Sequence, residues 1–269
     1  MVTKLQALVG MVVLGTASVT FAAPAVVNFD LTGTLANELG NNLATAPVYT
    51  GLGAAGVGGN ASGSAVWNTP SASLGQTSVQ NLYTFTNVVD SLGNPTNIGL
   101  NFNYQGSYYD NSASLDTNAG DPQTMLQAYA YDYFNSNNPD STGNNANPMI
   151  TVTGLNTADT YNIYVYTING TFGGRATSLL YNGNSYLNTY PGGATDTTFS
   201  AGVDYTELTN VSPDANGSVA ITYLPAGNQG EADFNGVQVV ETPEPSTGAA
   251  LLAAGIGGML VIRRRRARS

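Results

Sequence analysis

Short segments in which apolar and polar residues alternate recur along the middle of the chain. In residues 96–104, TNIGLNFNY, the side chains of Ile98, Leu100, Phe102 and Tyr104 share one face of an extended strand, and the residues between them are asparagine or glycine. Successive side chains of a strand point to opposite faces, so this pattern predicts a half-buried strand. Similar segments predict strands at residues 26–31, 81–89, 148–155, 160–168, 176–183, 218–224 and 234–241.

Asparagine-glycine pairs lie next to several of these segments, at Asn169-Gly170, Asn182-Gly183 and Asn216-Gly217. Both residue types tolerate the positive φ angles of tight turns. Many short strands separated by such turns predict an all-β fold, an antiparallel β-sandwich. We read residues 23–241 as one such domain.

One segment, from Asp121 to about Tyr133, is predicted as a helix. Asp121 can cap it and Pro122 suits its first turn. Four apolar or aromatic side chains would share one helical face, although the tyrosines among them fit a strand equally well: Met125, Leu126, Tyr129 and Tyr133.

The N-terminus predicts a secretory signal peptide in residues 1–22. Lys4 is followed by an apolar run from Leu5 to about Val19 and then by small residues. Cleavage after Ala22 would place small residues at the positions that signal peptidase reads. An uncleaved membrane anchor is the alternative.

The C-terminus carries an uncharged run, Gly248 to Ile262, followed by five arginines. As a helix this run would span roughly 22 Å, which is short for a bilayer core of about 30 Å. Clustered positive charge stays on the cytoplasmic side of a membrane and fixes the orientation of a segment. The arginines are therefore interpreted as a stop-transfer and orientation signal: Arg263, Arg264, Arg265, Arg266 and Arg268.

Residues 242–269 resemble the PEP-CTERM sorting signal of Gram-negative bacteria. The resemblance rests on Pro243, Glu244, Pro245 and Ser246, followed by the short apolar span and the arginines. It implies that an exosortase in the inner membrane cuts near the motif, so that a transiently anchored protein reaches the cell surface or the extracellular space. A plain C-terminal anchor is the alternative.

The middle of the chain is similar to jelly-roll domains, galactose-binding-like in fold, that accompany such tails. The similarity rests on the order of VNFD, YTGLGAAG, VVDSLGNPT, ITVTGL, TYNIYVYTI, SPDANGSVAITY and FNGVQVVE. It implies a jelly roll, and members of that fold often bind sugars, frequently with a structural calcium ion.

Charge and composition exclude several classes of function. All seventeen carboxylates lie between Asp30 and Glu244, where the only basic residue is Arg175. Nucleic acids need a basic surface, so we exclude them as partners. The chain has no histidine and no cysteine, which leaves carboxylates, tyrosines or oxygen-ligated calcium as the available chemistry.

Three parts of the chain are candidate ligand sites. Trp67, the only tryptophan, could stack on a sugar ring, although a single tryptophan beside a valine is more often a core residue. Arg175 could clamp a ligand or serve as an internal ion-pair partner. The segment 104–123 gathers three tyrosines and three aspartates in a predicted loop, which suits a polar ligand or calcium: Tyr104, Tyr108, Tyr109, Asp110, Asp116 and Asp121.

Two further carboxylate motifs have simpler explanations. Asp214-Ala-Asn216-Gly217 echoes half of a calcium loop, but a β-hairpin turn before SVAITY explains it fully. Glu231 and Asp233 could form the carboxylate pair of a glycoside hydrolase, yet a chain with seventeen carboxylates offers many such pairs.

These observations predict an exported, non-catalytic surface protein that is processed by signal peptidase and exosortase and binds extracellular polysaccharide. A structural matrix protein that acts by self-association is the first alternative, because low charge and exposed Asn/Thr faces suit contacts at sheet edges or with polysaccharides. A carboxylate-based glycoside hydrolase is the second.

Overall fold

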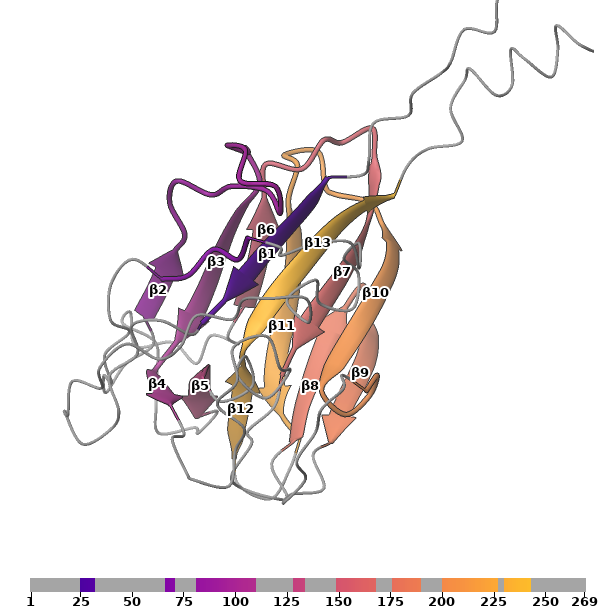
Figure 1. The fold of residues 1–269 in the computed structure, drawn as a ribbon. Coiled ribbons are helices and arrows are strands. Elements are labelled where there is room, and N and C mark those ends of the chain that lie inside the picture. Colours follow the sequence, from indigo (N-terminus) through magenta and orange to yellow (C-terminus); the bar gives the residue numbers. More distant parts are fainter. Residues whose placement is uncertain are drawn as a thin grey trace, which may run out of the picture.

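The computed structural model of the chain describes residues 25–31, 66–70, 81–109, 128–133, 149–167, 176–189, 200–226 and 230–242. These residues contain no helix, and their strands form three sheets whose ladders are all antiparallel (Figure 1). The prediction of an all-β, antiparallel, sandwich-like fold is confirmed. The predicted signal peptide and sorting signal lie outside the described residues.

The first sheet has four strands in the order β1-β13-β7-β10. Val26 of β1 is paired with Val240 of β13, so the start of the first strand lies beside the end of the last (Figure 1). The strands are β1 (Val26–Asp30), β13 (Gly236–Thr242), β7 (Thr160–Tyr166) and β10 (Tyr205–Val211).

The second sheet has six strands in the order β2-β3-β6-β11-β8-β9. Its buried side chains alternate with more exposed ones, most clearly in β3 and β6, as the period-2 pattern predicts. The strands are β2 (Asn81–Thr84), β3 (Gly99–Tyr104), β6 (Met149–Thr153), β11 (Val219–Pro225), β8 (Ala176–Tyr181) and β9 (Asn184–Thr189).

A third sheet of three strands, β12 (Glu231–Phe234), β5 (Ala128–Tyr133) and β4 (Gly106–Tyr109), corrects the prediction of a helix. The segment AYAYDY is extended, and it pairs with both neighbours. Tyr129 and Tyr131 alternate with small or polar residues, which matches the period of a strand. Pairing on both edges outweighs the capping signal of Asp121, which lies outside the described residues.

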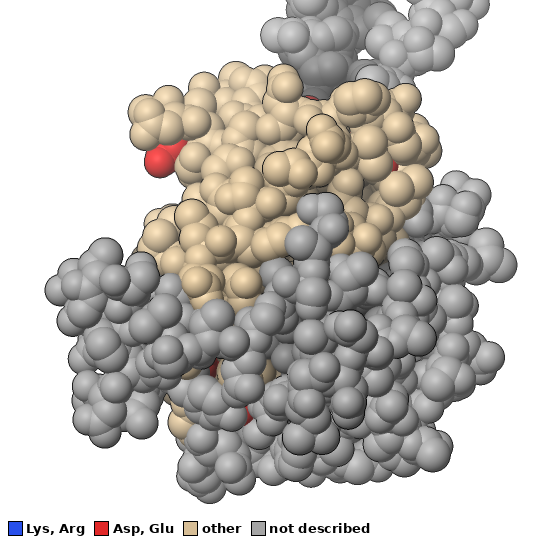
Figure 2. Space-filling model, turned by 90° about the vertical axis from the view of Figure 1, so that its left-hand side faces the viewer, with Lys and Arg blue, Asp and Glu red and all other residues tan. Residues whose placement is uncertain are grey.

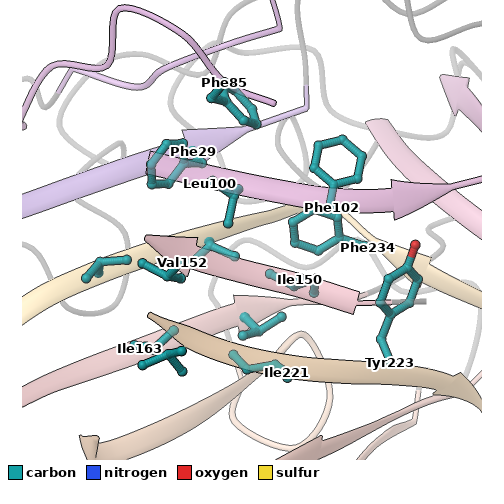
Figure 3. Close-up of a cluster of buried hydrophobic side chains, with 14 of the residues drawn as sticks. Phe29, Phe85, Leu100, Phe102, Ile150, Val152, Ile163, Ile221, Tyr223 and Phe234 are labelled. Carbon is teal, nitrogen blue, oxygen red and sulfur yellow. The ribbon is translucent and has the colours of Figure 1, made fainter. Parts of the chain in front are cut away.

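The core lies between the sheets (Figure 3). Leu100, Phe102, Ile150 and Ile221 of the six-stranded sheet have no exposed surface. Ile163 and other buried residues of the four-stranded sheet belong to the same cluster. Because the chain has no cysteine, no disulfide cross-links this core, and apolar packing stabilises it instead.

Two of the predicted turns are present, in different roles. Asn182 and Gly183 have φ angles of 48° and 75° and join β8 to β9 in a two-residue hairpin. Gly217, with φ 72°, lies in a turn that leads from β10 in one sheet to β11 in another. This second turn therefore connects two sheets rather than closing a hairpin. Asn169-Gly170 lies outside the described residues.

Candidate functional site

The pairing of the six-stranded sheet aligns the outward side chains of its strands in rows. Asn103 lies opposite Leu82, and Thr222 is paired with both Met149 and Leu180. Their chain neighbours Phe102, Ile150 and Leu179 point inward and are fully buried. We call the opposite side, formed by the residues that alternate with this core, the outer face.

The outer face has no charged side chain among the residues that define it. It combines hydroxyls, amides and separated apolar groups, and three of its apolar residues are well exposed, Leu82 at 65%, Leu187 at 53% and Met149 at 40%. The residues of the outer face are Leu82, Thr84, Asn101, Asn103, Met149, Thr151, Thr153, Ser178, Leu180, Ser185, Leu187, Ala220, Thr222 and Leu224.

The absence of charge on this face is notable in a chain with a formal net charge of −10. On the side of the molecule that includes β2, the described surface is tan apart from a few acidic atoms (Figure 2). The carboxylates of the described residues lie instead in the other two sheets and in the connecting turns. A charged ligand would therefore find no charged partner on the outer face.

The corresponding side of the four-stranded sheet is covered. Asn28 and Gln238 on this side have no exposed surface, and the Gln238 side chain donates a 2.8 Å hydrogen bond to that of Asn28. Trp67 is 6% exposed and packs edge-to-face against Tyr166, with ring centroids 6.3 Å apart. The only tryptophan thus occupies a buried position, in agreement with the core interpretation and not with a platform for sugars.

A hollow of about 330 Å³ opens where the β8–β9 turn approaches the start of β11. It adjoins the outer face through Ala220, which belongs to both. Its walls are mainly polar and include one tyrosine, whose pKa is raised by burial. The lining residues are Tyr181, Asn182, Ser212, Pro213, Asp214, Ser218, Val219 and Ala220.

Asp214 in this hollow has a structural role. One of its carboxylate oxygens accepts hydrogen bonds from the backbone N–H groups of Asn216, at 2.8 Å, and Ser218, at 2.9 Å. Gly217 closes the turn with a positive φ. The predicted turn is present at this motif, but it leads from β10 in the four-stranded sheet to β11 in the six-stranded one and is therefore not the hairpin turn that we expected. Asp214 itself is exposed.

Comparison with protein-family models, curated proteins and solved structures finds no match for the chain. The candidate site therefore rests on geometry alone.

Of the predicted ligand residues, the structure describes the side chains of Trp67 and Tyr104. Tyr104 ends β3 on its inner side, is 8% exposed and packs against Phe102 at 5.7 Å between ring centroids. Burial, and secondarily Tyr83, raises the pKa of its phenol. Tyr108 belongs to β4, and nothing further is described for its side chain.

The remaining predicted site residues fall almost entirely outside the described part of the chain. Tyr109 ends β4, and its side chain is not described. The described residues contain no group of three or more acidic side chains that could hold a metal ion, and no helix among them is long and apolar enough to cross a membrane. The predicted calcium, clamp, sorting and membrane-orientation residues lie outside the described part of the chain. These residues are Asp110, Asp116, Asp121, Arg175, Pro243, Glu244, Pro245, Ser246, Arg263, Arg264, Arg265, Arg266 and Arg268.

Glu231 and Asp233, the carboxylates of the hydrolase alternative, lie on β12 and are each 2% exposed. The Thr177 hydroxyl accepts a 2.9 Å hydrogen bond from the backbone N–H of Asp233 and lies 3.2 Å from its carbonyl oxygen. Nearby, burial raises the pKa of Tyr223 well above its usual value, and the charges of Asp132 and Asp233 raise it further. Both carboxylates therefore lie in a packed interior.

Sequence reasoning missed the outer face as a site, although it predicted most of its strands. The alternating signal was present in residues such as Thr151, Thr153 and Thr222. What the sequence could not supply was the strand order, which places β11 between β6 and β8 and so brings distant threonines and asparagines onto one surface.

Proposed function

We propose that this protein is an exported, surface-sorted and non-catalytic β-domain that binds a neutral extracellular polysaccharide through the outer face. The observation that carries the proposal is the uncharged composition of this face in an acidic chain. Uncharged polysaccharides present hydroxyl groups that bond to amides and hydroxyls, and patches of C–H that pack against apolar side chains. The outer face offers both kinds of group in adjacent rows.

The shape of the surface supports a polymer as the ligand. The rows cross strands β2 to β9, so the surface is extended and not a closed pocket. Small molecules usually bind in concave sites that bury most of their surface. The adjoining hollow, with Tyr181 and Asn182, would take one sugar residue or a branch of a chain lying on the face.

The proposal of surface sorting is supported by the way the domain ends. Backbone hydrogen bonding between β1 and β13 continues to Ala25 and Glu241, at 2.9 Å. The hydroxyl of Thr242 donates a 2.8 Å hydrogen bond to the backbone carbonyl of Thr160. Since Pro243 follows directly, cleavage by an exosortase near this motif would leave every strand of the described domain intact.

The finer fold that we propose is a jelly roll. The chain passes from β6 in one sheet to β7 in the other, returns through β8 and β9, and crosses again at β10 and β11. Repeated crossing between two antiparallel sheets is typical of Greek-key architectures.

A glycan array on residues 23–242 tests the binding function. We expect binding to neutral polysaccharides, and we expect Thr222→Asp, which places a negative charge in the middle of the outer face, to weaken it at least about tenfold, or roughly 1.4 kcal/mol. Thr209→Asp is the matched control, because Thr209 is exposed on β10 of the other sheet. It should bind like the unchanged chain.

The same array separates the alternatives. Repeating it in EDTA tests calcium, and loss of binding would direct mutagenesis to Asp110, Asp116 and Asp121. Release of reducing ends from a polysaccharide would favour the hydrolase. No binding with or without calcium would refute the binding proposal and leave self-association as the leading function.

A further inference from the structure

The edges of the described sheets differ in how they are protected. An exposed edge strand offers unpaired backbone groups to other chains, and proteins usually block it with charges, bulges, very short strands or a covering segment. β1 is covered by residues 66–70, where Asn68 exchanges backbone hydrogen bonds of 3.0 and 2.9 Å with Asp30 and Asn28. β10 has a bulge between Leu208 and Val211 and carries the exposed Glu207.

Three further edges are short or occupied. β2 and β4 have four residues each. On β12, the backbone N–H and C=O groups of Asp233 are hydrogen-bonded to the hydroxyl of Thr177 on β8 of the six-stranded sheet. β9 differs from all of these, because it has six residues, NSYLNT, with no charge and no proline.

The geometry of the β8–β9 hairpin shows which backbone groups of β9 point outward. In a two-residue hairpin the flanking residues, here Tyr181 and Asn184, form a hydrogen-bonded pair, and the pairs then alternate. Ser185, Leu187 and Thr189 therefore direct their N–H and C=O groups away from β8. Thr189 shows this directly, because its N–H donates a 3.2 Å hydrogen bond to the carbonyl of Gly202. Among the described residues no other strand pairs with Ser185 and Leu187, and both residues are exposed.

We propose that β9 pairs with β9 of a second copy of this chain, antiparallel and about a two-fold axis near Tyr186. Ser185 of each copy then lies opposite Leu187 of the other, and each pair exchanges two backbone hydrogen bonds. A second copy fits because two acidic chains repel wherever their carboxylates meet, whereas β9 and its neighbour β8 carry no charge. This contact does not depend on polysaccharide binding.

Thiol cross-linking tests the register of the pair. The chain has no cysteine, so full-length Ser185→Cys and Leu187→Cys chains carry single thiols. The two variants are mixed in detergent solution with a mild oxidant, and the rate of formation of the mixed disulfide is measured. It should be at least about tenfold faster than for a mixture of Leu82→Cys and Thr84→Cys, because pairing of β9 raises the effective concentration of the thiols. Leu82 and Thr84 have the same spacing and exposed face on the short edge β2.

Sedimentation velocity provides a second measurement in which no thiol is used. The sedimentation coefficient of the full chain should rise with concentration, and Leu187→Lys should abolish this rise whereas Leu82→Lys should not. Fluorescence of the buried Trp67 checks that each variant is folded. Equal cross-linking rates on β9 and β2, or a concentration dependence that survives Leu187→Lys, would overturn the proposal. Both results are obtained without a glycan and so leave the binding function to its own test.

Discussion

Replacing Phe102 by alanine should remove one of the contacts that tie the six-stranded sheet to the three-stranded one. Phe102 has no exposed surface, and its ring lies 5.2 Å from that of Phe234 on β12, in an edge-to-face arrangement. The rings of Tyr83 and Tyr104 lie within 5.7 Å on other sides. Phe→Ala in a core costs about 3–5 kcal/mol, and aromatic pairs add to simple burial. We therefore expect a loss of about 4 kcal/mol, which is large against total stabilities of about 5–15 kcal/mol.

Urea unfolding followed by the fluorescence of Trp67 measures this loss. The single tryptophan is 6% exposed and lies on the far side of the other sheet, so it reports global unfolding without contacting the substituted residue. Leu82→Ala, at a position that is 65% exposed, is the control and should change the free energy of unfolding by less than about 0.5 kcal/mol. A loss below about 1 kcal/mol for Phe102→Ala would refute the packing described for this cluster.

Three further outcomes are expected in the same unfolding assay. Gly217→Ala should lower the free energy of unfolding by at least about 1 kcal/mol more than Gly183→Ala does. Both glycines have a positive φ, but only at Gly217 would the new Cβ lie 2.4 Å from a backbone carbonyl oxygen. Equal losses for the two variants would contradict this reasoning. Burial, and then the hydrogen bond to Glu207, raises the pKa of Tyr164 to about 12. The contribution of Tyr164 to the stability of the domain is therefore fully present below the unfolded pKa near 10 and is lost as the pH rises toward 12. Tyr164→Phe should make the loss of stability over this pH range smaller. Asn68→Ala should cost about 1–3 kcal/mol, because the Asn68 amide bridges β1 to residue 89 with bonds of 2.8–2.9 Å; a neutral effect would show that the bridge is dispensable.

The sequence was informative about strands and turns because both are local signals. Alternation at 98–104 and the Asn182-Gly183 pair identified β3 and the turn that follows β8, since period and turn type need only neighbouring residues. Several strands of the described residues were not predicted, and one of them, β5, was predicted as a helix. The strands that were not predicted are β4, β5, β9, β10 and β12. β12, EADF, has only four residues, and all of them are buried, including the carboxylates Glu231 and Asp233, so its sequence does not indicate its burial. For such segments the partner strands decide the conformation.

The candidate site was less predictable than the fold, for a physical reason. Aromatic residues such as Trp67 and Tyr104 suit both sugar stacking and core packing, and the structure places both in buried positions. The residues of the outer face carry no such distinctive chemistry. Thr222 or Asn103 becomes informative only when strand order and register place it in a row with its neighbours.

The proposed β9 contact and the proposed binding surface would reinforce one another. Antiparallel pairing about a two-fold axis perpendicular to the sheet keeps opposite residues on the same face, so Ser185 and Leu187 of the two copies would all lie on the outer side. The two six-stranded sheets would become one, and their outer faces one continuous surface. A polysaccharide that spans both copies would bind the second face as an intramolecular step, which increases avidity without any new type of contact. Individually weak contacts to neutral hydroxyl groups would then suffice to hold the protein on a matrix. Leu187→Lys should therefore weaken retention on an immobilised polymer more than it weakens affinity for a short oligosaccharide.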